Sequence, residues 1–70
     1  MERDLVISTT FKSVGYDPVA RLLELEFLDG PVYQYGEIPQ IIYEDFKSAD
    51  SPGAYFNLRI KDHYPYQRIA

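Results

Sequence analysis

The pattern of apolar and polar residues has a two-residue period in the first half of the chain and a helical period in the second half. Leu23, Leu25 and Phe27 alternate with two glutamates, so the apolar side chains share one face of an extended chain. This alternation predicts a strand over residues 21–28, with one face against a core and both glutamates facing water.

Two more strands flank that one. Residues 9–16 alternate well enough for a strand, and Asp17-Pro18 ends it because this dipeptide favours a turn. Val32–Tyr35 is the third expected strand, and a hairpin turn at Asp29-Gly30 joins it to the second.

The hairpin turn decides where the tyrosines of the third strand point. Pro31 has no N–H to close a two-residue loop, so we favour a three-residue loop over residues 28–30. That loop sets Tyr33 opposite Leu25 and turns both Tyr33 and Tyr35 toward the helices. A four-residue loop would shift the register by one residue and turn both tyrosines outward.

Two helices are predicted after the third strand. Apolar residues at i, i+4, i+8 and i+11 predict a first helix over residues 39–48. A second helix is expected over residues 52–63, with Ser51 as its N-cap, Pro52 in its first turn and Pro65 as its stop. The apolar stripe of the first helix consists of Ile38, Ile42, Phe46 and Ala49.

Three antiparallel strands in a meander, followed by two helices packed on one sheet face, form an α+β domain. Residues 1–8 are expected to be frayed, although their apolar members could pack or join a partner's edge strand. Residues 66–70 are expected to be a tail. The residues expected to be mostly buried are Leu23, Leu25, Phe27, Ile42, Phe46, Phe56 and Ile60.

The composition limits how such a domain is stabilised. The 70 residues make one domain, and a chain this short has a small core. It has no cysteine for a disulfide or a thiolate metal site and only one histidine, so no metal or cofactor is expected. Seven tyrosines and four phenylalanines supply large apolar surfaces, and formation of a homo-oligomer is another expected source of stability.

The formal net charge of −4 argues against a general nucleic-acid binder, because phosphate contacts dominate that affinity. The charge is uneven, however: residues 51–70 carry three basic residues against one acidic, and residues 1–50 carry four against ten. The second helix therefore holds either a solvated charged face or a local basic patch for an anionic partner. No signal peptide or membrane-spanning run is visible, so we expect a cytoplasmic location without membrane contact.

Several motifs, taken in order, resemble the KTSC domain, which is named for its place at the C-terminus of some lysyl-tRNA synthetases. The resemblance covers about residues 8–66. It implies a small domain that also occurs alone in bacteria and phages, with tRNA or other nucleic-acid binding suggested by the synthetase context and no catalytic residues defined. The residues that carry it are Ser13-Val14-Gly15-Tyr16-Asp17, Leu25-Glu26-Phe27, Gly30, Tyr33-Gln34-Tyr35, Ile38-Pro39, Tyr43, the run from Ala49 to Asn57, Ile60-Lys61 and Tyr64.

No nucleophile has a visible partner, so no catalytic residue is proposed and an enzyme is the least expected class. Two classes remain: a binding module that contacts RNA or another nucleic acid, and a protein–protein or self-association module without nucleic-acid binding. Exposed aromatic side chains can stack single-stranded bases, which favours the first class. The candidate binding residues are Tyr33, Tyr35, Ser51, Tyr55, Asn57, Arg59, Lys61 and Tyr64.

Each candidate also has an expected structural role. Tyr33 and Tyr35 fit the rim of the core, Ser51 fits a helix cap, and Asn57 fits a polar network with Ser51 and the tyrosine hydroxyls. Two basic residues of the second helix, at positions 59 and 61, are splayed by about 200° and cannot share one face. If an anionic ligand binds, one of them should therefore matter much more than the other.

Overall fold

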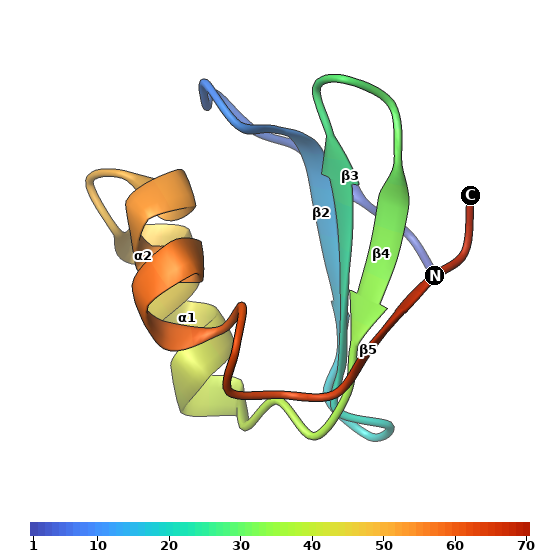
Figure 1. Ribbon diagram of the computed structural model, residues 1–70. Helices are drawn as coiled ribbons and strands as arrows, with labels where there is room; N and C mark the ends of the chain where they lie inside the picture. The colour runs from blue at the N-terminus through green and yellow to red at the C-terminus, as the bar shows by residue number, and fades with distance from the viewer.

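The computed structural model describes residues 1–70 and contains a five-stranded antiparallel sheet with two helices on one face (Figure 1). Each strand pairs with the next one along the chain, so the order across the sheet is β1-β2-β3-β4-β5. Both termini lie on the side away from the helices. The elements are β1 (Asp4–Leu5), β2 (Phe11–Asp17), β3 (Leu22–Phe27), β4 (Val32–Tyr35), α1 (Gln40–Ser48), α2 (Pro52–Arg59) and β5 (Tyr66–Arg68).

The α+β class is confirmed, but the prediction of three strands is wrong, because each terminal segment adds a strand at one edge of the sheet. In β1, Asp4 lies opposite Val14 of β2, and in β5, Tyr66 lies opposite Tyr35 of β4. Both strands are only two or three residues long, and all their residues are exposed. A strand pairs with an existing sheet edge through backbone hydrogen bonds alone. It therefore needs no alternation of apolar and polar residues, and the sequence pattern does not reveal it.

The hairpin between β3 and β4 has the predicted three-residue loop. Pro31 has no N–H to donate, but its carbonyl accepts a hydrogen bond from the Phe27 N–H at 2.9 Å. Gly30 has a φ of +119°, a backbone conformation that side chains with a Cβ rarely adopt. In the resulting register Tyr33 lies opposite Leu25, and Tyr35 is turned toward the helices and buried.

The core lies between the sheet and the two helices. Of the residues expected to be mostly buried, Phe27 and Ile42 are only partly so, although both pack against the core. Phe56 of α2 is central, because its ring meets those of Phe11, Phe27 and Tyr35 edge to face. The nine core residues are Phe11, Val14, Leu23, Leu25, Tyr35, Ile38, Phe46, Phe56 and Ile60.

The second helix is shorter than predicted. Ser51 caps it as expected, accepting a hydrogen bond from the Ala54 N–H at 3.2 Å. It ends at Arg59 instead of His63, because the regular i→i−4 pattern stops there: the Lys61 N–H donates at 2.9 Å to the Phe56 carbonyl, five residues back. The chain then turns back toward the sheet. The four-residue apolar spacing survives this turn, which is why the sequence pattern hid the end of the helix.

The outer face of the sheet differs from the prediction that its glutamates face water. Glu24 is only 8% exposed; the Arg3 guanidinium lies 3.1 Å from its carboxylate, and the Gln34 side-chain amide donates to it at 2.9 Å. The Ser13 hydroxyl donates to the partly buried Glu26 at 2.8 Å. Both carboxylates are thus bound to protein groups and serve the attachment of the N-terminal segment.

Gly15 explains how that segment approaches the sheet so closely. A Cβ at this position would collide with the backbone carbonyl of Glu2 and press on the side chain of Arg3. The absence of a side chain lets the first residues lie flat over the outer face. The N-terminal segment is therefore packed on the sheet and is not frayed as predicted.

Candidate functional site

The structure distributes the eight candidate residues over separate places on the surface. Four of them line one hollow beside the hairpin of β3 and β4, and two line another between the helices. The remaining two, Ser51 and Tyr55, lie elsewhere. The first group is Tyr33, Tyr35, Asn57 and Lys61, and the second is Arg59 and Tyr64.

The first hollow, which we call the aromatic hollow, has a volume of about 340 Å³. It lies between the β3–β4 hairpin and the end of α2. Four of its lining residues are aromatic, and three are polar or charged. Its lining residues are Phe27, Asp29, Pro31, Tyr33, Tyr35, Phe56, Asn57 and Lys61.

Aromatic side chains continue from this hollow onto β5. The Tyr66 ring stacks on the Tyr35 ring with centroids 5.4 Å apart and lies 5.9 Å from the Tyr33 ring. Tyr66 is 63% exposed, and Arg68 lies opposite Tyr33 on the same strand pair. The three tyrosines and the arginine form a strip at the sheet edge, which we call the tyrosine strip.

Sequence reasoning missed Tyr66 and Arg68, because residues 66–70 were expected to be a tail. The alternation of Tyr66, Gln67 and Arg68 after Pro65 was a signal of a short strand. Three residues are too few for that alternation to stand out from chance.

Tyr35 combines deep burial with a polar end that faces the hollow. Its side chain is 3% exposed, and no side-chain hydrogen bond of the molecule includes its hydroxyl. No buried polar side-chain atom lacks a partner, so solvent must reach this hydroxyl. Burial, then the nearby Tyr66, Tyr33 and Asp62, raises the pKa of Tyr35 to about 12. At neutral pH the hydroxyl is therefore a neutral donor with free hydrogen-bonding capacity.

The charges near the aromatic hollow are mixed. Lys61 stands at its rim and Arg68 follows along the tyrosine strip, while Asp29 also lines the hollow. Asp62 is close enough to affect the Tyr35 hydroxyl. The surface therefore offers flat aromatic faces with two basic residues, but it is not a strongly positive patch.

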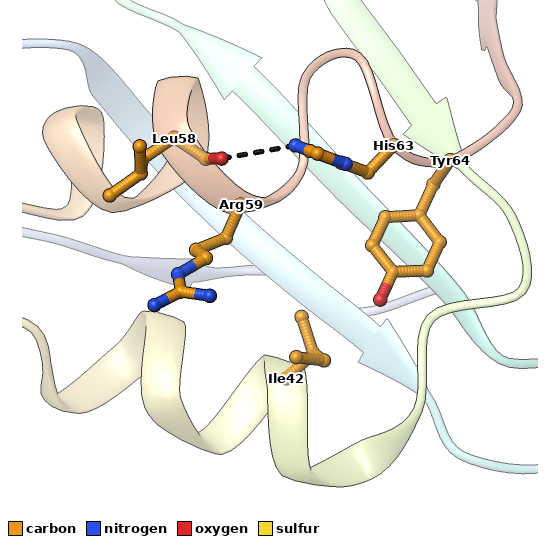
Figure 2. A pocket seen from close by; sticks show the side chains of 5 residues that line it. All are labelled: Ile42, Leu58, Arg59, His63 and Tyr64. Atoms are coloured by element: carbon orange, nitrogen blue, oxygen red, sulfur yellow. Dashed lines mark hydrogen bonds between the residues drawn. The ribbon is translucent and has the colours of Figure 1, made fainter.

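The second hollow, which we call the interhelix hollow, has a volume of about 500 Å³ and lies between α1 and α2 (Figure 2). In Figure 2 the Arg59 guanidinium extends from α2 toward α1, and the Tyr64 ring closes the opposite side. The His63 ring is held by a contact of 3.1 Å between its Nε2 and the Leu58 carbonyl. The lining residues are Ile42, Leu58, Arg59, His63 and Tyr64.

Ser51 and Tyr55 have structural roles. The Ser51 hydroxyl binds the first turn of α2 and lines a third hollow with residues of the β1–β2 connection, so it is separated from Asn57. The Tyr55 ring packs against Phe46 with centroids 6.3 Å apart, and burial, followed by the Asp45 charge, raises its pKa. The expected polar cluster of Ser51 with Asn57 is thus not formed.

Two further findings bear on the kind of site present. No group of three or more His, Cys, Asp or Glu side chains lies together in a way that could hold a metal ion. Neither helix has the length and apolar character needed to cross a bilayer.

The sheet with two covering helices defines a small α+β domain whose distinctive surface is the tyrosine strip. The chain belongs to the KTSC domain family, whose model matches residues 7–64. The resemblance seen in the sequence motifs is thereby confirmed.

Known proteins match this chain both alone and inside a larger enzyme. An uncharacterised protein of Stutzerimonas stutzeri (strain A1501) is 40% identical over 70 residues, which cover 99% of each chain. A lysine–tRNA ligase of Nostoc sp. (strain PCC 7120) is 34% identical over 59 residues, which cover 84% of this chain and 10% of the ligase. The crystal structure of a KTSC domain protein from Yersinia pestis superposes with a TM-score of 0.92 at 37% identity, covering 99% of this chain and 97% of that one.

Proposed function

We propose that this domain is a non-catalytic binding module that contacts single-stranded RNA through the tyrosine strip and the aromatic hollow. The observation that carries the proposal is the gathering of exposed tyrosine rings beside two basic side chains. Tyr33 is partly exposed and Tyr66 is 63% exposed, with Lys61 and Arg68 next to them. Flat aromatic faces beside cations are the usual means of holding unstacked bases.

The relatives support an RNA partner. The lysine–tRNA ligase of Nostoc, which by its name acts on tRNA, contains a segment similar to this chain over a tenth of its length. A domain of this size inside such an enzyme has an RNA substrate close at hand. We carry this to the present chain as part of the proposal.

Stacking, more than charge, would supply the affinity. Each stacked base contributes about 1–3 kcal/mol as measured by alanine substitution. Only Lys61 and Arg68 are placed to contact phosphates, and each neutralised phosphate of a single strand lowers the slope of log K against log salt by about 0.7. We therefore expect a slope of about −1.4, much shallower than that of a basic nucleic-acid binder.

The test is fluorescence anisotropy of a labelled single-stranded RNA pool over a salt series. Tyr33→Leu keeps an apolar side chain but loses the flat ring, and it should weaken binding roughly fivefold or more. Lys61→Glu should weaken binding and flatten the salt slope. Lys12→Glu is the matched charge control, because Lys12 is exposed at the irregularity of β2 and lines neither hollow.

Circular dichroism melts of the same variants separate loss of binding from loss of folding. Absence of RNA affinity even at low salt would rule out this proposal. Equal effects of Lys61→Glu and Lys12→Glu would also rule it out, since they would show general electrostatics and no defined site.

A self-association module is the second candidate. Both edge strands are open, and apolar side chains stand exposed on them, with Leu5 81% exposed on β1 and Tyr66 63% exposed on β5. Exposed edges can pair with another chain. Sedimentation of the wild-type protein without RNA tests this directly: dimers without RNA affinity would favour self-association, and monomers would exclude it.

A further inference from the structure

The interhelix hollow has features of a ligand site that RNA stacking does not use. It is about 500 Å³, within the size range of small-molecule sites. It shares no lining residue with the aromatic hollow, which Lys61 lines, so a ligand here would not touch the tyrosine strip. What it binds can be argued from its charge and its apolar lining.

Arg59 supplies a positive charge that no carboxylate of the protein neutralises. The only ion pairs within 4 Å in the molecule are those of Arg3 with Glu24 and Glu26. The Arg59 side chain is exposed, and its guanidinium projects over the hollow (Figure 2). A guanidinium binds one carboxylate through two parallel hydrogen bonds, so this single residue suffices for a monovalent carboxylate.

The rest of the lining is largely apolar. Ile42 is partly buried at the floor and packs against the core, while Leu58 stands 68% exposed at the rim. The partly buried Tyr64 ring forms the far side, and its hydroxyl points toward Ile42 in Figure 2. An aliphatic side chain between Ile42 and Leu58 would remove apolar surface of both from water.

His63 forms a hydrogen bond across the turn that precedes Tyr64. Because the Leu58 carbonyl can only accept, the Nε2 atom in contact with it carries the proton. This bond ties the turn after α2 to the helix end.

We propose that the interhelix hollow binds the C-terminal residue of a partner protein when that residue is aliphatic, with its carboxylate on Arg59 and its side chain against Ile42 and Leu58. A C-terminal residue carries its carboxylate and side chain on one Cα, which matches a charge and an apolar floor in one hollow. An internal acidic residue would place a neighbouring aliphatic side chain on the opposite side of an extended segment. A phosphate would use the guanidinium but leave the apolar floor uncovered.

The test is a titration of the ¹⁵N-labelled full chain, followed by amide chemical shifts. The probe is N-acetyl-leucine, a minimal C-terminal leucine, with a dissociation constant on the order of 1 mM expected for so small a ligand. N-acetyl-leucinamide is the matched uncharged probe, and inorganic phosphate tests the anion alone. Saturable shifts with N-acetyl-leucine should centre on Ile42, Leu58, Arg59 and Tyr64.

Two variants separate this site from a nonspecific charge effect. Arg59→Gln should weaken N-acetyl-leucine roughly tenfold or more, as expected for loss of a charge-assisted hydrogen bond. Lys61→Gln removes the same charge two residues away and should leave the affinity unchanged. Both side chains are exposed, and the amide spectrum of each variant shows directly whether it is folded.

Several results would overturn the proposal. These are equal binding of the amide and the acid, equal effects of the two variants, or no saturable shift at the hollow. Saturation of the same amides by inorganic phosphate as tightly as by N-acetyl-leucine would instead assign the hollow to phosphate groups. Because Arg59→Gln should not alter RNA binding at the tyrosine strip, failure here leaves the RNA proposal standing, and the reverse also holds.

Discussion

Replacing Phe56 by alanine tests whether α2 is held to the sheet by the aromatic cluster that the structure shows. Phe56 is 4% exposed, and its ring lies edge to face against three others. The centroid distances are 5.5 Å to Phe11, 5.8 Å to Phe27 and 5.3 Å to Tyr35. Truncation removes all three contacts and opens a cavity at the centre of the core.

The expected cost is large relative to what the domain has. A buried Phe→Ala change lowers the free energy of unfolding by about 3–5 kcal/mol. The core of a domain this small rarely supplies more than about 3–5 kcal/mol in net stability. We therefore expect Phe56→Ala to be largely unfolded at room temperature. Phe56→Leu keeps most of the apolar volume but loses the ring contacts, so it should stay folded with a loss of about 1–2 kcal/mol.

Urea denaturation followed by far-ultraviolet circular dichroism gives the free energy of unfolding of each variant. Leu58→Ala is the control on the same helix, because Leu58 is 68% exposed and its truncation should change stability by less than about 0.5 kcal/mol. A loss below about 1 kcal/mol for Phe56→Ala, or a loss equal to that of the control, would show that the ring is not a central part of the core.

Two other features of the structure give further predictions. The Tyr35 hydroxyl, with its pKa of about 12, should be the last tyrosine hydroxyl to ionise as pH rises. Ultraviolet titration of the folded protein should therefore lose its highest-pH step in Tyr35→Phe and keep that step in Tyr66→Phe. Since the unfolded chain would release this proton near pH 10.0, stability should fall as pH rises from there toward 12; an unchanged titration in Tyr35→Phe would contradict this. Gly15→Ala should displace the N-terminal segment and expose β1 amides to hydrogen exchange, with β3 amides still protected. A chain lacking residues 1–5 should tolerate the same substitution at no further cost, and an equal loss in both backgrounds would refute the proposed collision.

The sequence predicted the fold correctly at positions where the chemistry of a single residue excludes other backbone conformations. Pro31 cannot donate the hydrogen bond that a two-residue loop requires, so the register of β4 and the inward direction of Tyr35 followed from a single missing N–H. Ser51 before Pro52 likewise predicted the start of α2, and the structure has both the cap and the start.

Features that depend on contacts between distant segments were not predictable. The alternation of β3 indicates which face is polar, but it cannot show that residues 1–3 cover that face and bind Glu24. β5 lies beside β4, and next to this pair the Gly36 N–H donates to the Pro65 carbonyl at 2.8 Å. Tyr66 and Arg68 entered the candidate site only through this pairing. The four-residue spacing of Asn57 and Lys61, by contrast, predicted that they lie close together, and both line the aromatic hollow although α2 ends at Arg59.

The eight residues of α2 contribute to the lining of both hollows. Phe56 of α2 and Ile60 at its C-cap are buried in the core, and Phe56 also lines the aromatic hollow. Asn57 faces the aromatic hollow, while Leu58 and Arg59 face the interhelix hollow. A change at the buried stripe moves the helix and must disturb both hollows together. A change at Arg59 or Lys61 leaves the helix in place, so each of these residues can affect one surface alone. The two proposed ligands can therefore be tested by separate surface variants, provided that the Phe56 anchor is intact.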